Sequence, residues 1–466
     1  MIDVDKQIRE FSEEFQKNKH PIRVSFRSLC SQWAWAKRSD VYTHLMHRYP
    51  AKILPYIPIY FLSSTRIAEP DDYVMDNFSG TGTVLLESIV HPYLKRDALG
   101  IEINPLARLI AKVKTTPLDE ASLSNEIADL ILRIKSIKDY DVPEFSSRDF
   151  WFPKHTQVEL AKIKSCIEEV EDIDYRDFFL VCLSQIIRDV SLADPKIAPP
   201  VLLKAEHFSK NRKRQLEVES LIKKKRNAQP ISQFIMALNN NFTRLKAINK
   251  NHRENGEHKA RVIWDDARAI KKGYLKGGGK IERRGARPIR NGAIGLVITS
   301  PPYINAQKYI RTTRLELLWL NLVKENQLKD LDRRLVGTER VTPDEYREMP
   351  LIGMKSADYV VEKIFRKNRK RATIVSRYFK DMREIMKETY RVLKPRGRFI
   401  LVVGNNTICQ ELVENHKILA EIGTHEAGFK LDTLLVDAIR SRGMITKRHE
   451  TGGMLEDEYV LVLSKD

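Results

Sequence analysis

The segment that most constrains the fold is 72–116, where a short apolar run leads into a glycine turn and then a helix. The run DYVMD ends in NFSGTGT, and the apolar stretch VLLESIV that follows has the length and composition of a helix. DALGIEIN then predicts a second strand, and PLARLIAKVKTT predicts a second helix. This alternation of strand, glycine turn, helix, strand and helix is typical of a doubly wound α/β sheet.

Further strands are predicted only after a long helical region, so an insertion interrupts the sheet domain. Helical spacing dominates between 118 and 250, and strands resume with ARVIWDDA, AIGLVITS and GRFILVVGNN. Near the end, LDTLLVDAI and EYVLVLSK are expected to pair as antiparallel strands. We expect an N-terminal helical extension (1–45), a sheet domain built from 46–115 and 256–466, and a large helical insertion (116–255).

The charge balance points to a polyanionic partner. The chain has 81 Lys and Arg against 62 Asp and Glu, a net charge of +19. Nucleic acid is the favoured partner, because no basic amphipathic helix is evident and no run approaches the roughly 20 apolar residues of a membrane span. Basic stretches occupy 210–226, 271–290 and 363–371. The glycine-rich stretch 271–290 precedes a predicted strand, and we expect it to bind phosphates.

The N-terminal residues and the cysteines favour a reducing, cytoplasmic setting. Residues 1–15 are charged and lack the apolar core of a secretory signal. Cys30, Cys166, Cys182 and Cys409 are scattered, and no pair has the spacing of a zinc site. We therefore expect neither a disulfide framework nor a metal.

The glycine turn and the second strand form a candidate nucleoside site. Gly80 and Gly82 allow a tight turn and a close approach to the backbone. Glu102 ends the second strand, where a carboxylate can accept hydrogen bonds from ribose hydroxyls. A nicotinamide dinucleotide and S-adenosylmethionine both fit such an acid. Leu85 stands where the dinucleotide motif needs a third glycine, which disfavours the dinucleotide.

The segment VITSPPYIN (297–305) runs from an apolar strand into a rigid turn. Pro301 and Pro302 fix φ and lack an N–H, and a residue before proline is driven to an extended conformation. Ser300 and the Pro301 carbonyl are therefore presented as acceptors beside the flat ring of Tyr303. This arrangement suits a planar ring that carries an exocyclic amine.

Together these motifs resemble the N6-adenine/N4-cytosine DNA amino-methyltransferase family. The matching pieces, in order, are DNFSGTGT, GIEINP, VIWDDAR, LVITSPPY and RVLKPRGRFILVVGN. Upstream, HRYPAKILPYIP (47–58) resembles the segment that closes over the methionine part of the cofactor. The resemblance covers about 45–115 and 258–466. It implies a Rossmann-like sheet dependent on S-adenosyl-L-methionine, with no metal.

The resemblance also assigns roles to residues. Cofactor binding falls to Asp76, Phe78, Gly80, Gly82, Glu102, Asp266 and Thr299, with Glu102 on the ribose and Asp266 on the adenine. Catalysis falls to Ser300, Pro301, Pro302 and Tyr303, with Tyr303 stacking on the flipped base. In the family, serine before Pro-Pro is associated with N4-cytosine and an acid or asparagine with N6-adenine, so Ser300 favours cytosine. None of the cysteines follows a proline, which argues against C5-cytosine chemistry.

The expected activity is site-specific methylation of double-stranded DNA, and several alternatives stay open. These are N6-adenine methylation, an RNA amino-methyltransferase, and, from other classes, a nicotinamide oxidoreductase or a silent nucleic-acid-binding module. A target base must leave the duplex to reach such a site. The insertion 116–255 is the favoured recognition domain and 307–375 its rival. We expect a prokaryotic restriction-modification setting with a cognate endonuclease; the oligomeric state is open.

Overall fold

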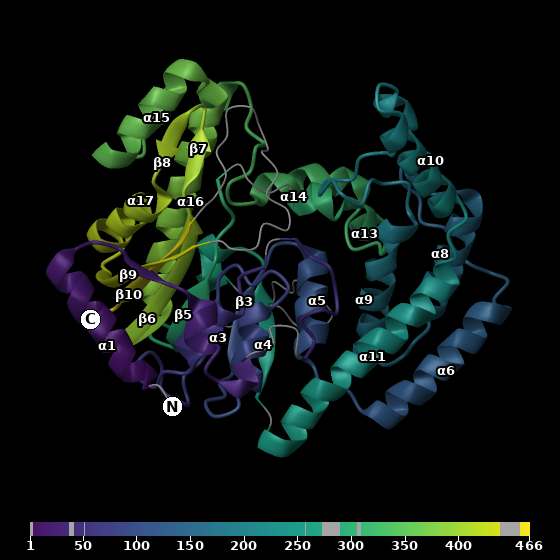
Figure 1. Ribbon diagram of the computed structural model, residues 1–466, viewed down its shortest axis with the longest axis horizontal. Helices are drawn as coiled ribbons and strands as arrows, with labels where there is room; N and C mark the ends of the chain where they lie inside the picture. The colour runs from purple at the N-terminus through teal and green to yellow at the C-terminus, as the bar shows by residue number, and fades with distance from the viewer. Residues whose placement is uncertain are drawn as a thin grey trace.

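The computed structural model describes residues 3–36, 42–50, 52–256, 258–272, 289–304, 309–438 and 457–466 (Figure 1). In this part of the chain, an eight-stranded sheet has the order β1-β9-β10-β6-β5-β2-β3-β4. The bounds are β1 Ile22–Val24, β2 Val74–Asp76, β3 Ala98–Ile101, β4 Ala260–Trp264, β5 Ile294–Thr299, β6 Leu393–Gly404, β9 Lys430–Ala438 and β10 Asp457–Ser464. A separate hairpin pairs β7 (Asn406–Ile408) with β8 (Glu411–Val413).

The sheet is mostly parallel, which confirms the Rossmann-like α/β fold expected from the sequence. β2 pairs in parallel with β3 and with β5, and the parallel pairing continues to β4 on one side and to β6 on the other. β10 is antiparallel to both of its neighbours, β6 and β9. The predicted antiparallel pairing of the last two strands is therefore confirmed.

The strand order changes direction beside β2. The chain passes from β2 outward to β3 and β4, and then crosses back to place β5 on the other side of β2. In open α/β sheets, ligands bind outside the carboxyl ends of the strands at such a switch point. β5 is buried along its whole length, as expected for a central parallel strand.

Helices cover both faces of the sheet (Figure 1). Ile400 and Val402 of β6 face a cluster that includes α1–α3, whereas Phe399 and Leu401 face a cluster formed with α15–α17. This alternation is the period of two that places neighbouring strand residues on opposite faces. The bounds are α1 Val4–Asn18, α2 Phe26–Cys30, α3 Tyr56–Leu62, α4 Thr83–Val90, α5 Pro105–Thr115, α15 Lys355–Lys367, α16 Arg369–Val392 and α17 Asn415–Glu421.

The insertion between β3 and β4 is helical, as the sequence predicts, and gathers on one side of the sheet (Figure 1). Its core includes Leu130, Phe178 and Leu245, and it packs on α5 and on α13 (Arg314–Trp319). A further short helix, α12 (Tyr309–Thr312), precedes α13, and α14 (Leu328–Arg334) follows it. The helices of the insertion are α6 Glu120–Ser136, α7 Arg148–Trp151, α8 Lys154–Glu168, α9 Ile173–Val190, α10 Arg212–Arg226 and α11 Pro230–Asn255.

The N-terminal segment 1–45 differs from the helical extension expected. It contains α1 and α2, but between them β1 joins the sheet beside β9, with Ile22 opposite Leu435. A three-residue strand is too short to show a periodic pattern in the sequence. Its conformation is set by pairing with β9 and not by a pattern of its own. Within its described residues, the segment therefore adds an edge strand to the sheet.

None of the helices in the described residues is long and apolar enough to cross a membrane. The four cysteines are free, and Cys30, Cys166 and Cys182 are buried.

Candidate active site

The turn after β2 is held by side chains from neighbouring strand ends. Oδ1 of Asp76 accepts a hydrogen bond from the Phe78 amide at 3.0 Å. Thr299, at the end of β5, donates from Oγ1 to the same oxygen at 2.6 Å and accepts from the Phe78 amide at 3.1 Å. Burial raises the pKa of Asp76 to about 7, although both hydrogen bonds favour the ionised form. Asp76 and Thr299 thus join two strand ends beneath the turn.

Glu102 follows β3 and faces the turn across the sheet edge. Its Oε2 accepts from the Gly80 amide at 2.9 Å, and its Oε1 accepts from the Asn104 amide at 2.7 Å. These two bonds fix the plane of the carboxylate, while each oxygen keeps a further lone pair. Burial raises the pKa of Glu102, and the backbone hydrogen bonds oppose that shift.

The two glycines of the turn have different surroundings. Gly80, at φ +49°, lines both cavities of the site. Gly82, at φ +75°, lines neither cavity and instead packs against α5: a Cβ at this position would lie 3.0 Å from Cβ of Ala111. Gly82 therefore permits the close approach of α4 and α5.

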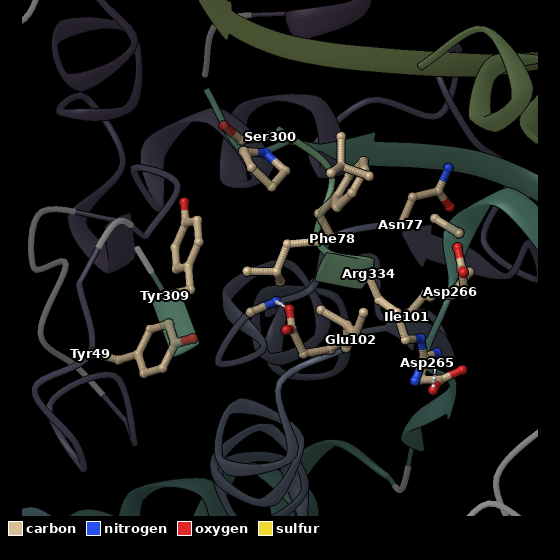
Figure 2. Close-up of a pocket in the computed structure, with 16 residues that line it drawn as sticks. Tyr49, Asn77, Phe78, Ile101, Glu102, Asp265, Asp266, Ser300, Tyr309 and Arg334 are labelled. Atoms are coloured by element: carbon tan, nitrogen blue, oxygen red, sulfur yellow. Dashed lines mark hydrogen bonds and ion pairs between the residues drawn. The ribbon is translucent and has the colours of Figure 1, made fainter. Parts of the chain in front are cut away.

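Two adjoining cavities lie at the carboxyl edge of β2, β3 and β5. The first has an empty volume of about 660 Å³, and Figure 2 shows Tyr49 and Tyr309 on one side and Asp265 and Asp266 on the other. We call it the cofactor-side cavity. Its lining is Tyr49, Asn77, Phe78, Gly80, Ile101, Glu102, Ile103, Asp265, Asp266, Ala267, Ser300, Pro302, Tyr309, Arg334, Leu335 and Val336.

The second cavity has an empty volume of about 730 Å³. We call it the target-side cavity after Ser300, Pro301 and Tyr303, which the sequence predicts to contact the target base. Asp76, Phe78, Gly80, Ser300 and Tyr309 contribute to its wall. Its other lining residues are Lys52, Ile53, Ser79, Thr81, Thr83, Pro301, Tyr303, Val402 and Glu458. Ser300 belongs to both cavities, whereas Pro302 lines the first and Pro301 and Tyr303 line the second.

Both acids after β4 reach the cofactor-side cavity, although the sequence singled out only Asp266. Arg268 binds Asp266 with two guanidinium nitrogens, each at 2.9 Å. Burial alone would raise the pKa of Asp266, but the hydrogen bonds from Arg268 outweigh it and lower that pKa. Asp265 is buried and pairs through Oδ2 with Arg334 at 2.6 Å. Asp265 and Arg334 are site residues that the sequence analysis missed.

The segment 47–58 reaches the target-side cavity through Lys52 and Ile53. Lys52 Nζ donates to the carbonyls of His44 and His47, at 3.1 and 2.9 Å. Burial lowers the pKa of Lys52 to about 8.

Glu458, at the start of β10, is another residue of the site that the sequence analysis missed. The Tyr303 hydroxyl donates to Glu458 Oε1 at 3.0 Å. Because β10 runs against β6, its first residues lie at the edge where β5 and β6 end, and Glu458 is opposite Gly404. The signal in the sequence was the acidic run EDE directly before the apolar run YVLVL, but the position of that run in the site depends on the direction of β10. Tyr309 follows residues 305–308, which lie outside the described residues. It lies near Ser300 (Figure 2), and no pattern in the neighbouring sequence predicts that position.

Of the three basic stretches, two are described. The stretch 210–226 includes α10, where Lys213, Lys223, Lys224 and Arg226 are exposed. In 363–371, Lys367 pairs with Glu411 at 2.6 Å, and Arg366 and Lys370 are exposed. Most of the glycine-rich stretch 271–290, which we expected to bind phosphates, lies outside the described residues.

No family model matches the chain. Among characterised proteins, it is 26% identical to Type II methyltransferase M.MvaI of Kocuria varians over 404 residues, which are 82% of this chain and 80% of that protein. It is 30% identical to Type II methyltransferase M.MjaII of Methanocaldococcus jannaschii over 99 residues, 21% of this chain and 18% of that protein.

A solved structure described as a DNA modification methylase from Thermus thermophilus is 20% identical and matches at a TM-score of 0.15. It covers 19% of this chain and 36% of its own chain, and so low a score carries no argument. The chain has a Rossmann-like α/β fold, and over most of its length it is similar to a Type II methyltransferase.

Proposed function

We propose that the protein is an S-adenosylmethionine-dependent DNA methyltransferase that methylates the exocyclic N4 amine of cytosine. The observation that carries the proposal is the position of Ser300, which lines both cavities. An acceptor at this junction can hold an amine from the target side against a methyl group from the cofactor side. The similarity to a Type II methyltransferase over 82% of the chain supports the same reaction class.

The cofactor-side cavity has the donor and acceptor groups that S-adenosylmethionine needs. Glu102 offers carboxylate oxygens for ribose hydroxyls, and Asp265 or Asp266 offers an acceptor for the adenine amine. Its cationic lining residue among the described residues, Arg334, is paired with Asp265, so no free charge is offered to a pyrophosphate. Leu85, in the third glycine position, is fully buried. These features favour an adenosyl sulfonium over a dinucleotide.

Ser300 and Pro301 perform the positioning in this proposal. The bound cofactor supplies an electrophilic methyl group. The Ser300 hydroxyl and the Pro301 carbonyl accept hydrogen bonds from the two amine N–H groups, which localises the nitrogen lone pair. Holding that lone pair in line with the methyl group lowers the barrier through orientation and electrostatics. Tyr303 or Tyr309 offers the aromatic face for the flipped base.

The amines of cytosine and adenine have the same hydrogen-bonding geometry, so hydrogen bonding alone does not distinguish them. The choice of cytosine rests on Ser300 as the residue before Pro-Pro. N6-adenine methylation is the second candidate, and an RNA amine is the third. The test is to incubate the protein with S-adenosylmethionine and unmethylated DNA or RNA, and to identify modified nucleosides by mass spectrometry. N4-methylcytosine from DNA is expected. N6-methyladenine alone would overturn the cytosine assignment. The absence of any methylated nucleoside would overturn the proposed methyltransferase activity.

The net charge of +19 supports a DNA partner, because phosphate contacts can offset the cost of extruding a base. We assign recognition to the helical insertion, 116–255, where exposed lysines and arginines gather on α10. The segment 307–375 is the rival recognition element. The sequence similarity to a Type II methyltransferase favours a cytoplasmic restriction-modification role with a cognate endonuclease.

A further inference from the structure

Methylation of an amine releases a proton, and a serine hydroxyl is too weak a base to keep it. Resting on the proposed function, we infer that Ser300, Tyr303 and Glu458 form a proton relay that carries this proton to the carboxylate of Glu458. Glu458 would thereby supply the basic group that Ser300 lacks, from a strand more than 150 residues further along the chain.

The hydrogen bond between Tyr303 and Glu458 has the direction that a relay requires. The Tyr303 hydroxyl donates to Oε1 of Glu458 at 3.0 Å. Ser300 lies beside Tyr303 in the wall of the target-side cavity. Burial raises the pKa of the Tyr303 phenol, and the Ser300 hydroxyl opposes that shift by lowering it. Because the phenolic proton is directed to Glu458, the phenolic oxygen is left to accept from the Ser300 hydroxyl. The Ser300 oxygen then keeps its lone pairs for the N–H of an amine.

The surroundings of Glu458 suit a proton acceptor. It lies on β10 between Gly404 of β6 and Asp437 of β9, and it lines the target-side cavity with Ser300, Pro301 and Tyr303. Burial is the main cause that raises the pKa of Glu458 above its ordinary value, and Asp437 adds to the shift. A carboxylate with a raised pKa binds a proton more readily than an exposed one.

Other ionisable groups of this cavity are less suited to the role. Asp76 has its Oδ1 occupied by Thr299 and by the Phe78 amide, and no hydrogen bond among the described residues connects it to Ser300. Lys52, with a pKa of about 8, is largely protonated at neutral pH, and its ammonium group is bound to two carbonyls. Glu458 is the carboxylate that accepts from the Tyr303 hydroxyl, next to Ser300 in the same cavity.

The step balances in atoms and charge. The amine nitrogen forms a bond to the methyl carbon, and the electrons of the broken carbon–sulfur bond neutralise the sulfonium. The methylated nitrogen passes a proton to Ser300 Oγ, whose own proton moves to the Tyr303 oxygen. The phenolic proton moves to Oε1 of Glu458. The products are a neutral methylamine, a neutral thioether and a protonated Glu458, which later loses its proton to water.

Two substitutions interrupt the relay without removing the aromatic ring or the volume of the carboxyl group. Glu458→Gln keeps the shape and abolishes the base, and Tyr303→Phe keeps the ring face and removes the hydroxyl. Each should lower the single-turnover rate of methyl transfer by about 100-fold or more. The dissociation constant of the cofactor should stay within about threefold of the wild type, since neither substitution alters the cofactor-side cavity. That of DNA should do the same, because the ring of Tyr303 and the volume of the Glu458 side chain are kept.

The double variant separates a relay from a structural hydrogen bond. Groups that act as one unit have non-additive effects, so Tyr303→Phe with Glu458→Gln should be no slower than the slower single variant. The matched control is Asp457→Asn: Asp457 precedes Glu458 on β10 but pairs with Arg23 at 3.0 Å, outside both cavities. This control should keep the wild-type rate.

The outcomes distinguish this inference from the proposed function. If the wild type methylates DNA and either single variant stays within about threefold of its rate, the relay is wrong and the methyltransferase stands. Multiplying losses in the double variant would also overturn the relay. If the wild type transfers no methyl group to any nucleic acid, the proposed function fails and the relay with it.

Discussion

At the scale of single residues, two acids and one serine of the site have different positions and different expected roles. Glu102 is oriented by two backbone amides and faces the cofactor-side cavity. Ser300 lines both cavities, and Asp76 lies beneath the turn with its carboxylate bound to Thr299. Each residue therefore has a separable consequence when it is replaced.

Ser300→Ala and Glu102→Ala should impair different steps: the first methyl transfer, the second cofactor binding. Ser300→Ala removes an acceptor for the amine, so methyl transfer should fall by about 100-fold or more while cofactor affinity is unchanged. Glu102→Ala removes a charged acceptor for the ribose, which is worth about 1.5–3 kcal/mol, so the cofactor dissociation constant should rise by about 10- to 100-fold. Calorimetric titration and single-turnover assays measure the two quantities. Near-normal turnover in Ser300→Ala would refute its acceptor role.

The raised pKa of Asp76 predicts a pH-dependent stability. In the unfolded chain an aspartate ionises near pH 4, whereas in the folded protein the pKa of Asp76 is about 7. Between these values the unfolded chain loses its proton first, so this contribution to the free energy of unfolding is present at low pH and is lost as pH rises to about 7.

Asp76→Asn should remove that dependence. The difference in unfolding free energy between the wild type and the variant should fall with rising pH, by up to about 1.4 kcal/mol per pH unit between pH 4 and 7. Urea titrations at four pH values would measure it. Glu316, whose pKa burial also raises to about 7, is present in both proteins and cancels. A difference that does not change with pH would contradict the assignment.

At the scale of elements, the turn between β2 and α4 is the critical junction. Gly82 takes a left-handed conformation at the start of α4, and the space beside it is filled by Ala111 of α5. The close approach of α4 and α5 helps to set where the turn lies relative to Glu102.

Gly82→Ala should destabilise the protein for two reasons, which a second glycine can separate. The left-handed backbone costs a residue with a Cβ about 1–2 kcal/mol, and crowding against Ala111 adds about 1–3 kcal/mol. Gly353 has a similar φ, +88°, but a Cβ there would meet nothing within 4 Å. Gly353→Ala should therefore show the backbone cost alone. Equal losses of unfolding free energy in urea would contradict the packing role of Gly82.

The elements near the turn could be predicted from the sequence, and those set by distant partners could not. β2, α4, β3 and α5 follow one another, so local periodicity and Gly80 identify them. The pairing of β1 with β9 joins residues more than 400 positions apart. In the same way, Arg334 reaches Asp265 from α14, and Glu458 enters the site because β10 is reversed. The positions of such residues depend on strand order and direction, which no local pattern in the sequence determines.

At the scale of the whole molecule, a sheet domain holds both cavities and a helical insertion lies to one side (Figure 1). The excess of positive charge amounts to +19 over the chain. This charge is a property of the surface and is independent of the chemistry at Ser300.

Binding to DNA should therefore weaken steeply with salt. Each phosphate contact releases condensed counterions, so six to ten contacts would lower affinity by about 10³–10⁵ between 50 and 200 mM salt. Fluorescence anisotropy with labelled duplex DNA measures the slope. Replacing the exposed Lys223, Lys224 and Arg226 of α10 with glutamine should reduce the slope, whereas Lys250→Gln, which pairs with Glu254, is the control. A flat response in the wild type would count against phosphate-dominated binding.

The reversed strand β10 has a consequence for the order in which the protein assembles. β10 lies between β6 and β9, although it follows both in the chain. β9 therefore has no neighbour toward the centre of the sheet until β10 has been synthesised. β10 carries Glu458 to Tyr303 and also provides the edge on which β9, and through it β1, pairs. One strand thus completes both the sheet edge and the wall of the target-side cavity.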